Sequence, residues 1–158
     1  MRKSLLYACL VLSVPASAVA QKARGEWWTV CQDDPIEDSR TCTVEIVPEN
    51  WKSEGSTPVI AISQTMLLIV IGFNNSPGSD VVIRIDDNKP IRWEDGKYPR
   101  PILLKVIEQL KTGKRIVTRY TRWPYNVPLD LATKSDPESF RRAFAEAKRK
   151  IAEYHKGK

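Results

Sequence analysis

The sequence GEWWTVCQDDPIEDSRTC, residues Gly25 to Cys42, places two tryptophans and two cysteines around a run of acidic and turn-forming residues. The segments beside that run, Trp27 to Val30 and Thr41 to Val47, are rich in residue types that favour strands. We therefore predict a β-hairpin that carries Cys31 and Cys42 on neighbouring strands.

The two tryptophans are predicted to lie on opposite faces of this hairpin. Side chains alternate between the faces of a strand, so Trp27 shares a face with Cys31, and Trp28 points the other way. If the cysteines pair, Cys42, Val44 and Ile46 lie on that same face. We expect Trp27 to cover the disulfide from the core side.

The first twenty residues have the pattern of a signal peptide. A positive start, Met1 to Lys3, precedes an apolar stretch from Leu5 to Val14, and the small residues Ala18 to Ala20 follow. We predict that residues 1–20 are removed on export, most simply to the periplasm. The outer surface and secretion are the alternatives.

Removal of that segment also removes Cys9, so Cys31 and Cys42 are the two cysteines left. Paired cysteines are expected in an oxidising compartment, and a short loop of this size gives about 3 kcal/mol of stabilisation. No C-x-x-C motif is present. We therefore predict a structural disulfide and not a redox centre.

The remaining residues, 21–158, have the size of one domain. The formal charge of +6 includes Arg2 and Lys3, so the exported chain carries +4. This excess is too small to indicate a nucleic-acid partner. The longest apolar run after the leader, Met66 to Phe73, is too short to span a membrane.

Strand signals follow the first hairpin at short intervals. The run Met66 to Phe73 is apolar throughout, which predicts a central strand covered on both faces. A turn at Asn74 to Gly78 then predicts a second hairpin with Asp80 to Asp86. Pro58 to Ser63 and Ile91 to Trp93 are further candidate strands.

The pattern changes to helical spacing at Ile102 to Thr112 and returns to alternation at Arg115 to Trp123, before an extended loop up to Pro128. Cap signals at Ser135 and Asp136 predict a last helix to about Tyr154. Its apolar stripe comprises Phe140, Ala143, Phe144, Ala147 and Ile151. Together these elements predict a mainly β fold, an antiparallel β-sandwich with a short helix and a C-terminal amphipathic helix.

The sequence offers little for catalysis. The one histidine, His155, lies in the basic tail, so neither a catalytic triad nor a metal site with histidine and cysteine ligands is predicted. We therefore expect no enzyme activity, no cofactor and no metal. One acidic group, Asp86, Asp87, Glu94 and Asp95, raises a carboxylate-dependent hydrolase or a calcium loop as alternatives, although these residues also suit ordinary turns.

A basic and aromatic group near the end of the predicted strand Arg115 to Trp123 is the better candidate for binding. Arginines can hold carboxylates or phosphates, and aromatic rings can stack on sugars or on a partner's side chains. The alternative is a solvated strand whose charges discourage aggregation. The candidate binding residues are Arg115, Arg119, Arg122, Tyr120, Trp123 and Tyr125.

In their joint order, several motifs resemble the invasion-associated locus B proteins of alphaproteobacteria. The resemblance covers most of the chain after the leader and implies a periplasmic or surface-associated β-sandwich without known catalysis, linked in some pathogens to host-cell entry. The matching segments are Gly25 to Trp27 before Cys31, the partner Cys42, Leu110 to Lys114, Arg115 to Trp123, and Pro137 to Phe144.

We therefore expect a non-enzymatic, exported binding or interaction protein of the cell envelope. Its partner would be an envelope or host protein, or an anionic envelope component. The alternatives are a carboxylate-dependent hydrolase of envelope glycans and, by analogy of fold alone, a small inhibitor of a lysozyme-like enzyme.

Overall fold

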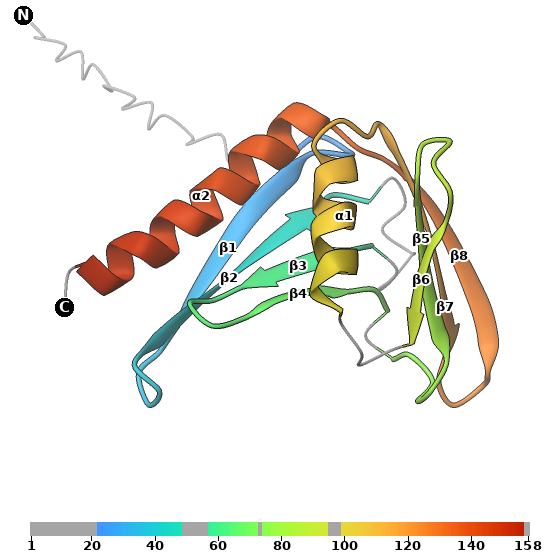
Figure 1. Cartoon of the computed structure of the whole chain (residues 1–158), viewed down its shortest axis with the longest axis horizontal. Helices are drawn as coiled ribbons and strands as arrows, with labels where there is room; N and C mark the ends of the chain where they lie inside the picture. Colours follow the sequence, from blue (N-terminus) through green and yellow to red (C-terminus); the bar gives the residue numbers. More distant parts are fainter. Residues whose placement is uncertain (1–21, 49–56, 73, 95–98, 157–158) are drawn as a thin grey trace, which may run out of the picture.

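The structure, a computed structural model, describes residues 22–48, 57–72, 74–94 and 99–156. They form two four-stranded antiparallel sheets and two helices (Figure 1), so the predicted antiparallel β-sandwich with a short helix and a C-terminal helix is confirmed. No helix in these ranges is long and apolar enough to cross a bilayer. The predicted leader lies outside the described residues.

Sheet A has the strand order β1-β2-β3-β4, and sheet B has the order β6-β5-β7-β8. The strands of sheet A are β1 Trp27–Asp34, β2 Ser39–Ile46, β3 Val59–Ile62 and β4 Leu67–Val70. Those of sheet B are β5 Asp80–Ile85, β6 Ile91–Glu94, β7 Arg115–Arg122 and β8 Val127–Lys134. The helices are α1 Arg100–Leu110 and α2 Pro137–Lys156.

The predicted β-hairpin with a disulfide between its strands is confirmed. Cys31 faces Cys42 in the β1–β2 register, and their sulfurs are bonded at 2.02 Å. Both strands are longer than expected because the turn is compact: the Asp34 carboxylate accepts hydrogen bonds from the backbone N–H groups of Ile36 and Glu37. The bond therefore joins the middle of two paired strands.

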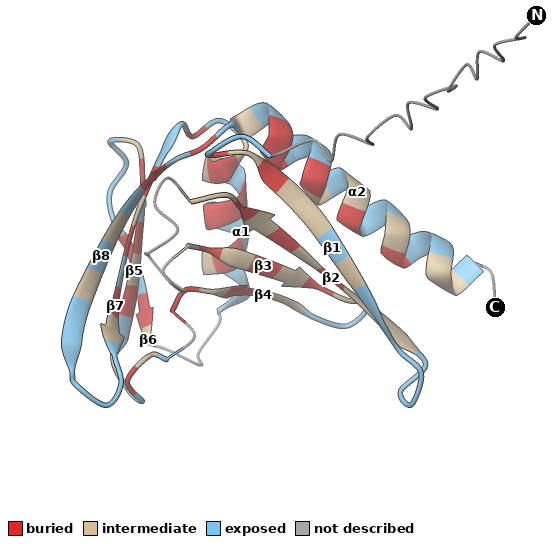
Figure 2. Ribbon diagram, turned by 180° about the vertical axis from the view of Figure 1, so that it is seen from behind, coloured by how far each residue is buried: buried red, intermediate tan, exposed pale blue. Residues whose placement is uncertain are grey.

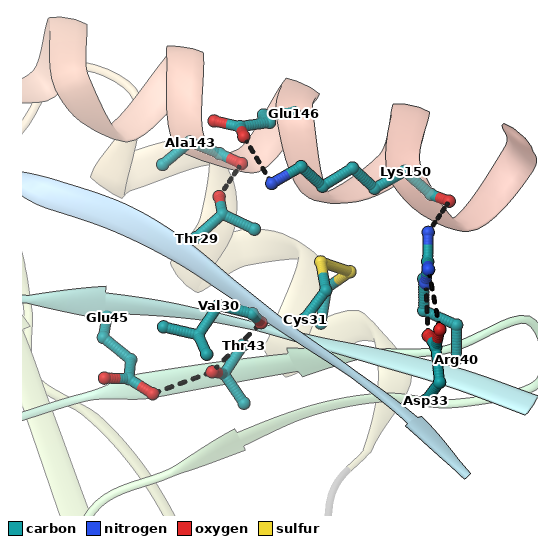
Figure 3. Close-up of a disulfide and its surroundings, with 11 residues drawn as sticks. Thr29, Val30, Cys31, Asp33, Arg40, Thr43, Glu45, Ala143, Glu146 and Lys150 are labelled. Carbon is teal, nitrogen blue, oxygen red and sulfur yellow. Dashed lines mark hydrogen bonds and ion pairs between the residues drawn. A yellow bond between two sulfur atoms is a disulfide. The ribbon is translucent and has the colours of Figure 1, made fainter. Parts of the chain in front are cut away.

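The face of sheet A that carries the disulfide packs against α2. Trp27 is buried, its ring meets Phe140 edge to face at 5.0 Å, and the Thr29 hydroxyl donates to the carbonyl of Ala143 at 2.7 Å. Figure 3 shows α2 passing over the disulfide. That Trp27 covers the disulfide stays a prediction. The predicted stripe of α2 is confirmed, since Phe140, Ala143, Ala147 and Ile151 are buried and Phe144 packs against the core.

The start of α2 uses one of the two predicted cap residues. The Asp136 carboxylate accepts hydrogen bonds from the backbone N–H groups of Glu138 and Ser139, both at 3.1 Å. The Ser135 hydroxyl instead accepts the indole N–H of Trp27 at 3.0 Å. Asp136 is therefore the cap, and Ser135 satisfies a buried donor of the first strand.

Sheet B contributes the other half of the core. The inward positions of β5 are Val81, Ile83 and Ile85, and all three are buried. Beside sheet A, α1 lies against β4 (Figure 1) and buries Leu103, Val106, Ile107 and Leu110. One cluster of buried side chains thus includes residues from both sheets and both helices.

Three predictions about strand pairing are wrong. β4 is an edge strand and not a central one, because it pairs with β3 and its outward residues Leu68 and Val70 are half-buried. β5 pairs with β6 and β7, so it forms no hairpin with β4. The predicted extended loop is a turn followed by β8, which pairs with β7 along its whole length.

Replacing Cys31 and Cys42 by serine should lower the free energy of unfolding by about 3 kcal/mol, because the closed loop no longer restricts the unfolded chain. Urea denaturation measures this, with the unchanged chain under reducing conditions as the control. The idea fails if a reducing agent leaves the denaturation midpoint where it was.

The change Asp136→Ala should lower the free energy of unfolding by about 1 kcal/mol at pH 7, because two backbone donors lose their acceptor. Although desolvation opposes its ionisation, hydrogen bonds from the backbone of Glu138 and Ser139 hold the pKa of Asp136 below its usual value. The ionised Asp136 carboxylate therefore contributes its full stabilisation above the pKa of about 4 that it has in the unfolded chain. This stabilisation is lost as the pH falls through the lower pKa that Asp136 has in the folded protein.

The difference between Asp136→Ala and the unchanged chain should accordingly shrink in urea titrations below about pH 4. Asp87→Ala, which removes an exposed turn carboxylate, is the matched control and should leave stability nearly unchanged. A difference that stays constant down to pH 2 would contradict the role of the ionised cap.

Candidate functional site

The strand register separates the predicted binding residues of β7 into two groups. Arg115 and Arg119 are exposed on the outer face of sheet B, whereas Tyr120 points inward. Arg122, two residues after Tyr120, is on the same face of the strand as Tyr120 but is exposed at the strand end. The three arginines therefore do not share one strand face. The alternation of side chains along a strand already places Arg122 on the face opposite to Arg115 and Arg119.

Tyr120 belongs to the core, with 3% of its surface exposed. Its ring lies against Gly72, where a Cβ atom would fall 2.3 Å from the ring carbon Cδ2. Gly72 also has a φ of +77°, which glycine adopts without strain. This close contact joins the end of β4 to sheet B and leaves the ring unavailable to a surface ligand.

The turn between β7 and β8 exposes three large apolar side chains, which we call the aromatic tip: Trp123, Tyr125 and Val127. Their exposed fractions are 55%, 71% and 48%. Trp123 and Tyr125 were predicted as binding residues, and the structure brings them together on one turn. Val127 was not predicted, because β8 itself was missed.

The aromatic tip is fixed to the loop that precedes β5. The backbone N–H of Trp123 donates to the carbonyl of Asn74 at 2.8 Å, and the N–H of Thr121 donates to the Asn75 side chain at 2.9 Å. The Ser76 hydroxyl donates to the side-chain oxygen of Asn126 at 2.8 Å. The apolar side chains therefore project from a backbone that is held on both sides of the turn.

A second feature of sheet B is an open hollow of about 290 Å³ on its outer face. Its floor contains Val82 and Val117. Its cations come from three adjacent strands, and we call them the arginine face: Arg84, Arg92 and Arg119. Arg119 was predicted from the sequence, but Arg84 and Arg92 were missed because their proximity depends on the pairing of β5 with β6 and β7.

Two of these arginines are already paired. Arg119 makes two hydrogen bonds of 2.5 Å to Asp130, and the side-chain bond holds the pKa of Asp130 below its usual value. Arg92 lies 3.3 Å from Asp80. Within the described part of the chain, Arg84 has no ion pair. Such a surface can bind a carboxylate or another anion by exchange with these exposed pairs.

Among the described members of the acidic group, Asp86 and Glu94 lie at opposite ends of the β5–β6 hairpin. Asp80 faces Glu94 across β5 and β6, and Asp86 directly follows β5, so its backbone lies about 20 Å from that of Glu94 at 3.3 Å per residue. Glycosidase carboxylates lie about 5 to 10 Å apart. The Asp86 carboxylate instead accepts the backbone N–H groups of Lys114 and Arg115, at 3.0 and 2.8 Å.

Asp86 and Glu94 are therefore too far apart to act as a glycosidase pair. Asp95 lies outside the described residues, and Asp87 is exposed in the turn after β5. Across the described ranges, no group of three or more histidine, cysteine or carboxylate side chains is placed to hold a metal ion. His155 lies in the last turn of α2, edge to face with Tyr154.

The two tyrosines of the predicted site should respond differently to mutation. Tyr120→Ala should lower the free energy of unfolding by about 3 to 5 kcal/mol, because it leaves a cavity between β4 and β7. Tyr125→Ala should change it by less than about 0.5 kcal/mol, because the ring is mostly in solvent. Equal effects in urea denaturation would contradict this assignment of core and surface.

Neither a protein-family model nor a curated protein matches this chain. Among solved structures, the chain is similar to the crystal structure of invasion associated protein b from Bartonella henselae, at 16% sequence identity. The match covers 85% of this chain and 97% of that one, with a TM-score of 0.40. The likeness is weak at this TM-score and does not place the chain in a family.

Proposed function

We propose that the chain is a non-enzymatic, exported binding domain of the cell envelope, and that it holds a protein partner through the aromatic tip. The carrying observation is the exposure of Trp123, Tyr125 and Val127 on a turn whose backbone is fixed by hydrogen bonds. Tryptophan and tyrosine are the residue types that most often dominate the free energy of protein association.

The rigidity of the tip favours this role. Association costs free energy when loops and side chains become ordered, and an already ordered turn reduces that cost. Asn126, at a φ of 51°, lies in the left-handed region that asparagine tolerates better than most residues. The turn is therefore built to present its rings and is not merely a loose connection.

The arginine face supports the same proposal. Arg119 lies on the strand that leads into the tip, and its outer position places it with Arg84 and Arg92. Exposed cations on the sheet that carries an apolar anchor steer an acidic partner and set its orientation more than they raise its affinity. We accordingly expect a partner that is acidic around an apolar pocket.

Export is part of the proposal. It is supported by the leader pattern of residues 1–20 and by the disulfide, which is typical of oxidising compartments. Mass spectrometry of the chain purified from the periplasm would test it, and the expected mature terminus is Gln21.

A photo-crosslinking residue at position 125, introduced in intact cells, should trap a discrete partner. The matched control is the same residue at position 36, because Ile36 is 89% exposed on the tip of the other long hairpin. The crosslink at 125 should disappear in a Trp123→Ser background, and position 36 should not yield the same species. An identical pattern at both positions, or a crosslink that survives Trp123→Ser, would remove the aromatic tip as the binding surface.

A further inference from the structure

A second concavity lies away from sheet B, where the turn between β3 and β4 faces α1 and α2. Its volume is about 530 Å³, within the range of about 300 to 1,000 Å³ usual for sites that hold small molecules. We call it the α1 groove. It is independent of the aromatic tip, and nothing in the sequence pattern indicated it.

The groove follows one face of α1. Arg100, Leu104, Ile107 and Lys111 line it at spacings of four, three and four residues, which places them in a row along the helix. Eleven residues at 1.5 Å each make this row about 16 Å long. The groove therefore follows the length of α1, with Arg100 at the start of the helix and Lys111 just past its end.

The middle of the groove is apolar and partly open to solvent. Leu103 and Ile107 form its floor from α1, and Phe144 contributes from α2. Leu104 and Met66 are 46% and 39% exposed on its sides. Those two side chains add little to the core, and exposed apolar groups beside a concavity mark binding sites.

The rim of the groove is positive. Arg100, Lys111 and Lys148 line it, and one carboxylate, Glu108, lies 2.5 Å from the ammonium group of Lys111. Among the described residues, Arg100 and Lys148 have no ion pair. An adjoining hollow shares Lys111 and Lys148 and adds Arg141, so the end of the groove near Lys111 carries the greater density of cations.

We propose that the α1 groove binds a long-chain fatty acid. The alkyl chain would lie along Leu103, Leu104 and Ile107, and the carboxylate would lie between Lys111 and Lys148. The length of the row along α1 fits a single extended chain, the apolar lining fits its methylene groups, and the cations near Lys111 fit its one negative head group. A neutral apolar ligand would make no ionic contact with Arg100, Lys111 or Lys148. A polyanion would not contact the apolar lining of the groove.

Calorimetry with tetradecanoate, at concentrations where it is monomeric, should show saturable binding with one site per chain. Tetradecyltrimethylammonium has the same alkyl chain and the opposite charge, and it should bind at least about tenfold more weakly. Dodecanoate, which is two methylenes shorter, should bind up to about sixteenfold more weakly than tetradecanoate, because each buried methylene contributes about fourfold.

Charge reversal at Lys148→Glu should weaken tetradecanoate binding about tenfold, and Leu104→Asp should abolish it. Both variants should stay folded, because Lys148 is exposed and Leu104 is 46% exposed. Arg84→Glu is the matched control, since it reverses one charge on the arginine face and should not alter tetradecanoate binding. Neither Lys148→Glu nor Leu104→Asp should affect the crosslink at position 125.

The proposal is overturned if tetradecanoate shows no saturable binding, if the cationic amphiphile binds equally well, or if Lys148→Glu has no effect. It is also overturned if the groove serves another occupant. That outcome would appear as a dimer in sedimentation that Leu104→Asp dissociates, or as binding to anionic phospholipid vesicles without uptake of free tetradecanoate.

Discussion

The packing of α2 on the β1–β2 hairpin is the interaction on which the rest of the structure depends. Trp27 lies at its centre: the ring meets Phe140, the indole N–H bonds Ser135, and the backbone N–H bonds Ser139 at 3.0 Å. These partners are more than one hundred residues apart in sequence. Without α2, the apolar face of sheet A would be open to water, including both cysteines.

Figure 2 shows buried positions along the side of α2 that packs on this face. The first and last elements of the fold therefore stabilise each other, and neither is expected to be stable alone.

This contact also determines where the surfaces lie. The segment between β8 and α2 is held by the backbone N–H of Asp136, which donates to Gly25 at 2.9 Å, and by the N–H of Ser135, which donates to Lys114 at 2.8 Å. One short connection thus ties the first hairpin, sheet B and α2 together. As a result, α2 presents Phe144 and Lys148 toward α1, and β7 and β8 extend away from the helices to the aromatic tip. The two proposed surfaces lie on separate elements of one scaffold, so a ligand at one need not contact the other.

Sequence patterns predicted what depends on neighbours in the chain. The disulfide-linked hairpin, the apolar stripe of α2 and its cap at Asp136 were all accessible, because turn formers, helical spacing and a capping carboxylate act over a few residues. The partner of β4 was not accessible, because an apolar strand does not identify its neighbour in the sheet. The same limit hid β8 and the arginine face, whose members come from three strands. The α1 groove depends on how two helices and a turn approach one another, which no local pattern specifies.

Two carboxyl groups, those of Asp130 and Asp136, are held ionised by their hydrogen-bond partners. Asp130 is held ionised by Arg119, and Asp136 by the first backbone N–H groups of α2, so the pKa of each carboxyl is lowered. A general acid near neutral pH needs the opposite shift, which arises when a carboxyl is buried without cationic or N–H partners. Here the carboxylates instead fix strands and helix ends, while exposed aromatic and cationic side chains occupy the tip and the groove. The burial of an exposed ring by a partner is favourable. On a turn that is already fixed, little free energy is lost in ordering the chain. This division between fixed carboxylates and projecting rings supports the proposal of a binding protein.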